Sequence, residues 1–103
     1  MSIVVFVTCA NKSEANKIAK ALIKAKLAAC VNLLNPVNSL FWWQGKVDSS
    51  KEILLIIKTK KRLFGKLEKL VKSLHSYDVP EIIAFPILMG NKKYLNWIDD
   101  STR

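Results

Sequence analysis

The chain has 103 residues, the length of one domain, so we expect residues 1–103 to form a single domain. Half of the residues are hydrophobic, a large share for a small domain, which buries only about two-thirds of the surface that its unfolded chain exposes. The surplus of apolar surface predicts an oligomer, because large exposed apolar patches promote association.

The formal net charge of +9 raises the question of a nucleic-acid or membrane partner. The lysines are spaced as on the solvated faces of two helices, and no RNP-like pattern, zinc finger or helix-turn-helix signature accompanies them. We therefore expect no nucleic-acid partner. The apolar start, Met1–Val7, is too short for a membrane span and lacks a basic leader, so we expect no membrane insertion and a cytoplasmic location. Cys9 and Cys30 lie in apolar surroundings without CxxC spacing, which predicts reduced, buried thiols.

The first half of the chain predicts strand, helix and strand. In chain order these are a strand at Ile3–Thr8, a helix from Asn11 to Lys26 or Leu27, and a strand at Ala28–Leu34. The first strand is a β-branched, nearly unbroken apolar run, which is typical of a central strand. Asn11 and Glu14 have the spacing of a capping box at the start of the helix. The pair Asn35-Pro36 is expected to break or bulge the second strand.

Residues 37–59 are expected to form a long β-hairpin. Aromatic side chains favour strands in Ser39–Lys46, Gly45 marks a turn or bulge, and Ile53–Ile57 is a second apolar strand. Adjacent residues of a regular strand point to opposite faces, so we expect one of Trp42 and Trp43 in the core and the other against a neighbouring subunit.

The second half predicts a helix, a loop, a strand and a short final helix. The helix carries apolar residues at helical spacing, namely Leu63, Leu67, Leu70, Val71 and Leu74. The loop is His75–Pro80, the strand is Glu81–Leu88, and the last helix opens at Gly90-Asn91. Pro86 favours an edge position for that strand, because proline cannot donate to a sheet ladder.

The element order is strand–helix–strand–strand–helix–strand with a terminal helix, which is the order of an α+β, ferredoxin-like βαββαβ sandwich. The hairpin at residues 37–59 is longer than this fold requires. A hairpin that projects beyond its own sheet can pair with the edge strand of a neighbouring copy. The fold therefore adds a second argument for an oligomer.

Five segments occur together and in order along the chain, namely Ala28–Asn32, Trp42–Lys46, Glu52–Thr59, His75–Ile83 and Tyr94–Ile98. In combination they closely resemble the CutA family, the divalent-cation tolerance proteins, over essentially the whole chain. The most specific parts are the aromatic-Gly-Lys turn and the His-x-Tyr-x-x-Pro-Glu segment. The resemblance implies a ferredoxin-like homotrimer with strands that pair between subunits, and links to copper tolerance and metal binding.

The chain departs from the family's usual pattern at several positions. Ser76 and Asp78 stand where the pattern has proline and glutamate, and Phe41 stands where a tyrosine often precedes the Trp pair. Some members carry a metal-linked cysteine at the end of the first strand, where this chain has Thr8 with Cys9 one residue later. One residue along a strand means the opposite face, so we do not carry that metal role over to Cys9.

His75 and Cys30 are the candidate metal ligands. His75 is the only histidine, and imidazole and thiolate are donors that copper and zinc prefer, so further ligands would come from Glu52, Glu81 or a symmetry-related subunit. The alternative for His75 is a hydrogen-bonded group at a helix end, where the dipole favours it. The alternative for Cys30 is a structural thiol in an apolar strand.

Six further residues are candidates for a cleft or ligand site between subunits: Trp43, Lys46, Glu52, Lys58, Tyr77 and Glu81. The two lysines could bind an anion beside the His75–Tyr77 loop, and the alternative is exposed or paired lysines. Glu52 is a candidate ion-pair partner for either lysine, and Tyr77 and Glu81 are expected to fix the loop to the sheet.

These residues leave three classes of function open. The first is a trimeric divalent-cation tolerance protein that binds copper or another divalent metal ion and takes part in the response to metal ions. The second is a PII-like sensor of small ligands, since the architecture also resembles the PII signalling proteins. The third is a trimeric scaffold that anchors an unidentified protein partner. No nucleophile–base pair and no phosphate-binding glycine loop is present, so we expect neither an enzyme nor an organic cofactor.

Overall fold

The computed structural model describes all of residues 1–103. Its elements are β1 (Ser2–Cys9), α1 (Lys12–Lys24), β2 (Cys30–Trp43), β3 (Lys46–Lys60), a 3₁₀ turn η1 (Lys61–Leu63), α2 (Phe64–Leu74), β4 (Ile82–Pro86) and α3 (Lys92–Asp100). The four strands form one sheet in the order β2-β3-β1-β4, and each neighbouring pair is antiparallel. This is the ferredoxin-like arrangement that the element order predicts.

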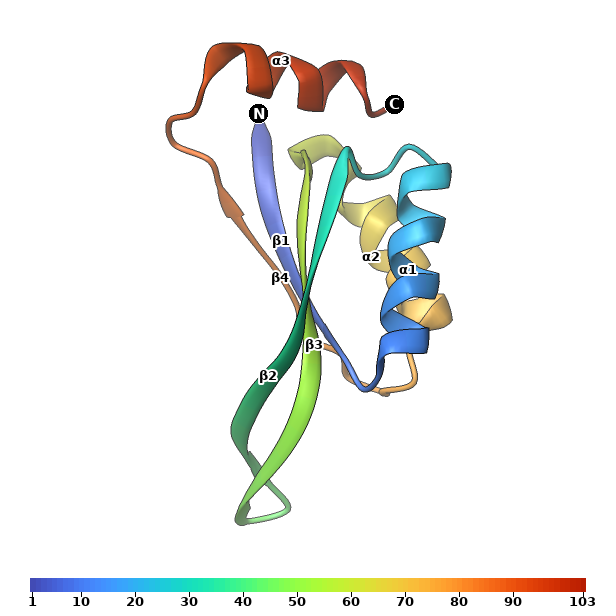
Figure 1. Ribbon diagram of the computed structural model, residues 1–103, viewed down its shortest axis with the longest axis vertical. Helices are drawn as coiled ribbons and strands as arrows, with labels where there is room; N and C mark the ends of the chain where they lie inside the picture. The colour runs from blue at the N-terminus through green and yellow to red at the C-terminus, as the bar shows by residue number, and fades with distance from the viewer.

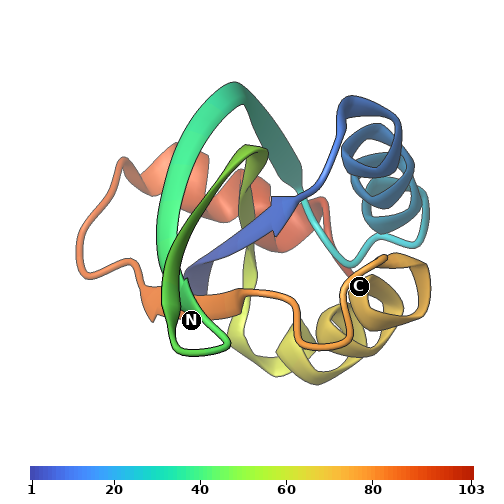
Figure 2. The ribbon, with the colours of Figure 1, turned by 90° about the horizontal axis from the view of Figure 1, so that it is seen from below.

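The core lies between one face of the sheet and the helices α1 and α2, which lie side by side on that face (Figures 1 and 2). Alternate residues of β1 point into this layer because strand side chains alternate between faces. The buried residues include Ile3, Val5, Val7 and Cys9 of β1, Ile18 and Leu22 of α1, Leu55 and Ile57 of β3, and Leu67 and Val71 of α2. The helices present one apolar stripe each, as their periodicity predicts.

Local capping explains where α1 begins and ends. The Asn11 side chain accepts a hydrogen bond from the Glu14 amide at 2.9 Å, which satisfies one of the free N–H groups of the first turn. At the other end, Lys26 has φ of 58°, its N–H bonds the Ile23 carbonyl, and the Leu27 N–H bonds the Leu22 carbonyl. This is a Schellman motif with lysine at the left-handed position, and it stops the helix at Lys24, two or three residues before the predicted end.

The β2–β3 hairpin projects well beyond the rest of the molecule (Figure 1). Its turn consists of Gln44 and Gly45, which have φ of 50° and 77°, the positive values that a two-residue hairpin turn favours. The register shifts between Leu34 and Val37, so the predicted bulge at Asn35-Pro36 is confirmed. Pairing between β1 and β3 stops at Cys9 and Ile53, and the part of the hairpin beyond it pairs only with itself.

Three predictions about burial and length need correction. Trp42 and Trp43 are 76% and 60% exposed, so neither is in the core, because the hairpin tip extends past the helices that form the second layer. Cys9 is buried as predicted, but Cys30 is only half-buried because β2 is an edge strand. β4 is shorter than predicted at both ends, although the edge position expected for Pro86 is confirmed.

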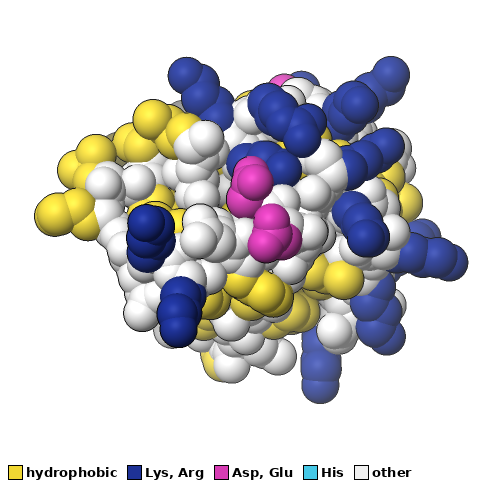
Figure 3. All heavy atoms as spheres, turned by 90° about the horizontal axis from the view of Figure 1, so that it is seen from above, with side chains coloured by type: hydrophobic (Ala, Val, Ile, Leu, Met, Phe, Trp, Pro, Cys, Tyr) yellow, Lys and Arg dark blue, Asp and Glu magenta, His cyan; other side chains and the backbone are white.

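The two sides of the molecule differ in chemistry. Lysine and arginine side chains gather on the side of α1 and α2, and hydrophobic side chains protrude on the opposite side (Figure 3). No helix covers the other face of the sheet (Figure 1). The strands and the hairpin leave large apolar side chains exposed, namely Leu33, Leu34, Leu40, Phe41, Trp42, Trp43, Val47, Ile83 and Phe85. None of the helices is both long enough and apolar enough to cross a bilayer.

Candidate functional site

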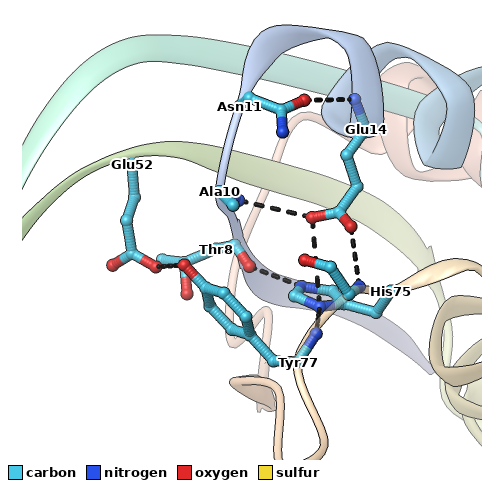
Figure 4. Close-up of polar contacts among 8 residues, drawn as sticks. Thr8, Ala10, Asn11, Glu14, Glu52, His75 and Tyr77 are labelled. Carbon is cyan, nitrogen blue, oxygen red and sulfur yellow. Dashed lines mark hydrogen bonds and ion pairs between the residues drawn. The ribbon is translucent and has the colours of Figure 1, made fainter.

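Three segments meet at one end of the sheet, two of them adjacent in sequence and the third distant (Figure 4). They are the end of β1, the first turn of α1 and the loop that follows α2. The topology requires this meeting, because β1 leads directly into α1, and the loop leads into β4, which starts opposite the end of β1 with Ile82 paired to Val7. The loop residues 75–81 therefore lie against the start of α1.

His75 is the centre of this region, and its side chain is fully buried. Its Nε2 lies 2.7 Å from the Thr8 carbonyl oxygen, and a carbonyl only accepts, so the ring carries its hydrogen on Nε2. Its Nδ1 accepts a hydrogen bond from the Tyr77 amide at 3.0 Å. One neutral tautomer therefore satisfies both ring nitrogens, and the predicted hydrogen-bonded role of the residue at the helix end is confirmed.

Glu14 joins α1 to the loop. Its Oε1 accepts a hydrogen bond from the Ser76 amide at 2.7 Å, and its Oε2 accepts one from the Ala10 amide at 3.3 Å and lies 4.0 Å from His75 Nδ1. Burial acts to raise the pKa of Glu14, but the hydrogen bonds from Ser76 and Ala10 outweigh it and hold the pKa below the ordinary value. Ser76 stands where the family pattern has proline, and its N–H makes a bond that a proline lacks.

Cys9 completes the group. Its Sγ, a carboxylate oxygen of Glu14 and a ring nitrogen of His75 all lie within 4.8 Å of one another. Burial, followed by the negative charges of Glu14 and Glu52, raises the pKa of the Cys9 thiol to about 12, so the thiol is protonated at neutral pH. We call Cys9, Glu14 and His75 the thiol–imidazole cluster.

The thiol–imidazole cluster has the donor types of a zinc or copper site. Zinc binds sulfur at about 2.3 Å and nitrogen or oxygen at about 2.0–2.2 Å, so tetrahedral ligand atoms are separated by about 3.3–3.7 Å. A pair of ligand atoms 4.8 Å apart would have to approach by about 1.1–1.5 Å to reach that separation. The residues therefore fit a divalent ion of this kind in both chemistry and spacing.

Sequence reasoning missed Cys9 and Glu14 as members of this group. Thr8 and Cys9 do point to opposite faces, as expected, but Cys9 points to the face that the helices cover, and His75 and Glu14 lie on that side. The available signal was the capping-box spacing of Glu14, which directs its carboxylate back over the end of the strand.

A second contact fixes the loop to β3. The Tyr77 hydroxyl donates to Glu52 Oε2 at 2.9 Å, and the rings of Tyr77 and His75 lie 4.8 Å apart. Burial, followed by the hydrogen bond to Glu52, raises the pKa of Tyr77 to about 12. Burial and then the charge of Glu52 also raise the pKa of Glu81. The role predicted for Tyr77 in fixing the loop to the sheet is thus confirmed, and its partner is Glu52.

The remaining candidate residues lie elsewhere in a single chain. Lys46 and Trp43 are paired at the hairpin turn, and Lys58 hydrogen-bonds the Asn32 side chain. Each lysine is six residues from Glu52 along β3, about 20 Å at about 3.3 Å per residue, so Glu52 forms no ion pair with either lysine within one chain.

Cys30 is also separate from the thiol–imidazole cluster, since it pairs with Lys58 in the sheet. A cleft between subunits that would include Trp43, Lys46 and Lys58 stays a prediction.

The fold and the site together define a class of protein: a ferredoxin-like α+β domain with an overlong apolar hairpin, a terminal helix and a buried cysteine–glutamate–histidine group. The sequence model of the family described as CutA1 divalent ion tolerance protein matches residues 3–101. The chain therefore belongs to the CutA1 family.

Relatives support this assignment over the full chain. The rice protein named "Protein CutA 1, chloroplastic" is 52% identical over 102 residues, which cover 99% of this chain and 58% of the rice protein. The divalent-cation tolerance protein CutA of Thermus thermophilus is 46% identical over 99% of both chains. The chain thus spans a little over half the length of its plant relative and nearly all of the bacterial one.

Solved structures show the same fold. The Cut A1 protein from Thermus thermophilus superposes with a TM-score of 0.98 at 46% identity and covers 100% of both chains. A structure described as the periplasmic divalent cation tolerance protein CutA from Archaeoglobus fulgidus superposes with a TM-score of 0.95 at 42% identity and covers 98% of both chains. The hairpin and the terminal helix are therefore part of the family fold.

Proposed function

We propose that the protein binds divalent metal ions, with copper and zinc as the favoured ions, at the thiol–imidazole cluster, and that it contributes in this way to the tolerance of divalent cations. The observation that carries the proposal is the approach of Cys9 Sγ, a Glu14 oxygen and a His75 nitrogen to within 4.8 Å of one another. Thiolate and imidazole are the protein ligands that copper and zinc prefer, and calcium and magnesium prefer sites built from oxygen.

The surroundings of His75 support this role. A histidine that binds a metal commonly donates its other ring N–H to a carbonyl or carboxylate, which fixes the tautomer and the ring orientation. The Thr8 carbonyl receives the hydrogen of Nε2 in this way and leaves the lone pair on Nδ1, the nitrogen that lies 4.0 Å from Glu14. Nδ1 is therefore the ligand atom.

The Cys9 thiol must lose its proton when it coordinates a metal ion, because the thiolate is the ligand. Its pKa of about 12 means that the ion competes with this proton at every physiological pH. Binding should release one proton from the thiol, and affinity should rise about tenfold for each unit of pH between 6 and 8. A site of oxygen ligands alone would show almost no dependence in that range.

We also propose that three copies assemble through the uncovered face of the sheet and the projecting hairpin. The exposed apolar side chains on these strands support association, since monomers rarely expose contiguous patches of this kind. The open edges of β2 and β4 offer unpaired backbone groups to a neighbouring strand. The number three rests on the resemblance to the CutA family, and sedimentation should give about three times the chain mass of 11.7 kDa.

The proposed role is binding without catalysis and without an organic cofactor. The cytoplasmic location predicted from the sequence stays a prediction, because the names of related proteins include a chloroplastic one from rice and a periplasmic one from Archaeoglobus fulgidus. A protein partner also stays a prediction.

Isothermal titration calorimetry with zinc and with copper tests the proposed site. Cys9→Ser and His75→Ala should each lower the affinity at least tenfold, because each removes one ligand. Cys30→Ser is the matched control, since it removes a thiol that lies outside the thiol–imidazole cluster, and it should bind like the wild type. Equal binding by all four proteins would show that the ions bind elsewhere.

A further inference from the structure

The ligand atoms of the thiol–imidazole cluster already have partners. His75 Nδ1 accepts the Tyr77 amide at 3.0 Å, and Glu14 Oε1 accepts the Ser76 amide at 2.7 Å. A nitrogen with one lone pair cannot bind a metal ion and accept a hydrogen bond at the same time. Coordination by Nδ1 must therefore displace the Tyr77 amide.

Coordination through Nε2 would not avoid this cost. Nε2 faces the Thr8 carbonyl at 2.7 Å, and this oxygen can accept but not donate, so the ring keeps its hydrogen there. A ring with the hydrogen moved to Nδ1 would set an N–H against the N–H of Tyr77. The loop must therefore shift for either nitrogen to coordinate.

The displaced Tyr77 amide and the Ser76 amide before it are consecutive, and both belong to the loop that leads into β4. The Ser76 amide ties this loop to α1, and the Tyr77 amide ties it to the buried His75 ring. The Tyr77 hydroxyl then anchors the same loop to Glu52 of β3. We call these three hydrogen bonds the loop latch.

We propose that metal binding and the loop latch exclude each other, so that a divalent ion at the thiol–imidazole cluster releases residues 76–81 from α1 and β3. This inference rests on the proposed function and adds regulation to the same site. The loop carries Asp78 and Val79, which are exposed, so its release changes the surface above a buried ion. Binding of an ion at the buried site would thus change the exposed surface of the loop, because coordination breaks the hydrogen bonds that hold the loop in place.

The closed loop also controls access to the site. Cys9 and the His75 side chain are fully buried, and Glu14 is mostly buried. An ion can reach these buried atoms only when the chain around them moves, and Ser76 and Tyr77 are hydrogen-bonded to two of the three cluster residues. The hydrogen bonds of the loop latch therefore oppose entry of the ion, and they break when the ion binds.

Hydrogen–deuterium exchange of the wild-type protein, with and without zinc, tests the inference. Zinc should speed exchange of the Ser76 and Tyr77 amides at least tenfold and should not speed exchange in the core strands. Equilibrium dialysis of the same samples measures bound zinc. Bound zinc with unchanged or slower exchange in the loop would overturn the latch and leave the proposed function intact. Failure to bind zinc would refute the proposed function, and the inference with it.

Two variants separate the latch from the ligands. Ser76→Pro removes one amide donor, and the backbone of His75, with φ of −85° and ψ of 142°, already has the conformation that a following proline requires. Tyr77→Phe removes only the bond to Glu52. Each should tighten zinc binding at least tenfold, a factor that corresponds to about 1.4 kcal/mol, because a hydrogen bond to a charged group contributes at least that much.

Tyr94→Phe is the matched control for Tyr77→Phe, because it removes a hydroxyl from α3 and should leave zinc affinity unchanged. A second readout needs no metal: in metal-free Ser76→Pro, the Tyr77 amide should exchange faster than in the wild type. Weaker or unchanged zinc binding by both latch variants would contradict the inference.

Discussion

Replacement of Glu14 by glutamine is the sharpest probe of how the loop is held. Glutamine keeps the shape of the side chain, but one of its two acceptor oxygens becomes an NH₂ group. In the wild type, the Ala10 amide donates to Oε2 at 3.3 Å and the Ser76 amide donates to Oε1 at 2.7 Å. In the variant, one of these two amides faces the NH₂ group, which cannot accept a hydrogen bond. A hydrogen bond to a charged group contributes about 1.5–3 kcal/mol. We therefore expect Glu14→Gln to lower the free energy of unfolding by about 2 kcal/mol at pH 7.

The pH dependence supplies a second check. The folded protein holds the pKa of Glu14 below its ordinary value of 4.5, so the unfolded chain binds this proton more readily than the folded one. The stability due to the carboxylate is therefore present above pH 4.5 and is lost as the pH falls through the lowered pKa. The difference between the wild type and Glu14→Gln should be largest at neutral pH and should shrink below about pH 4.

Urea denaturation at one fixed protein concentration, followed by circular dichroism from pH 3 to pH 7, measures both effects. Glu68→Gln is the matched control, because Glu68 forms only an exposed pair with Lys72 at 3.4 Å, and its loss should cost less than about 0.5 kcal/mol. Equal costs for the two variants, or a Glu14→Gln cost that does not change with pH, would refute the reasoning.

The other predictions concern the hairpin, the end of α1 and the core. Trp43→Ala should weaken assembly, because the indole is exposed in a single chain and is expected to pack against a neighbouring copy. Sedimentation velocity should then show more dissociation on dilution, and an unaffected oligomer would show that this ring is not part of the interface. Lys26→Gly should raise the melting temperature by a few degrees, since φ of 58° costs lysine about 1–2 kcal/mol, and a lower melting temperature would contradict this. Leu22→Ala should cost about 2–5 kcal/mol in urea denaturation, because the side chain is fully buried, and a cost below 1 kcal/mol would be too small for a packed core.

Local signals were enough to predict the order of the elements. Asn11 and Asn91 each cap the helix that follows them, and each accepts the backbone N–H three residues later. The turn at Gly45 and the bulge at Asn35-Pro36 follow from the conformations that glycine and proline favour. These features depend on residues close in sequence, so they can be read from sequence alone.

The composition of the site depends on tertiary structure. Cys9 and His75 are 66 residues apart, and they meet because β4 returns beside β1 and brings the loop before it over the end of that strand. Glu52 was expected to pair with a lysine, but neighbours along β3 are too far away, and the hydroxyl of Tyr77 from another segment takes that place.

The error at Trp42 and Trp43 has a related cause. Alternation along a strand says which face a side chain points to, but not whether anything covers that face. The hairpin tip extends past α1 and α2, so both indoles are exposed in a single chain (Figure 1).

The most direct test of metal binding at the thiol–imidazole cluster is a nitrogen-15 NMR spectrum of the imidazole ring during a zinc titration. His75 is the only histidine, so the ring signals need no assignment. The metal-free protein should show a neutral ring with its hydrogen on Nε2, and one equivalent of zinc per chain should shift the Nδ1 resonance and leave that hydrogen in place. Ring nitrogens that stay unchanged at saturating zinc would contradict the account.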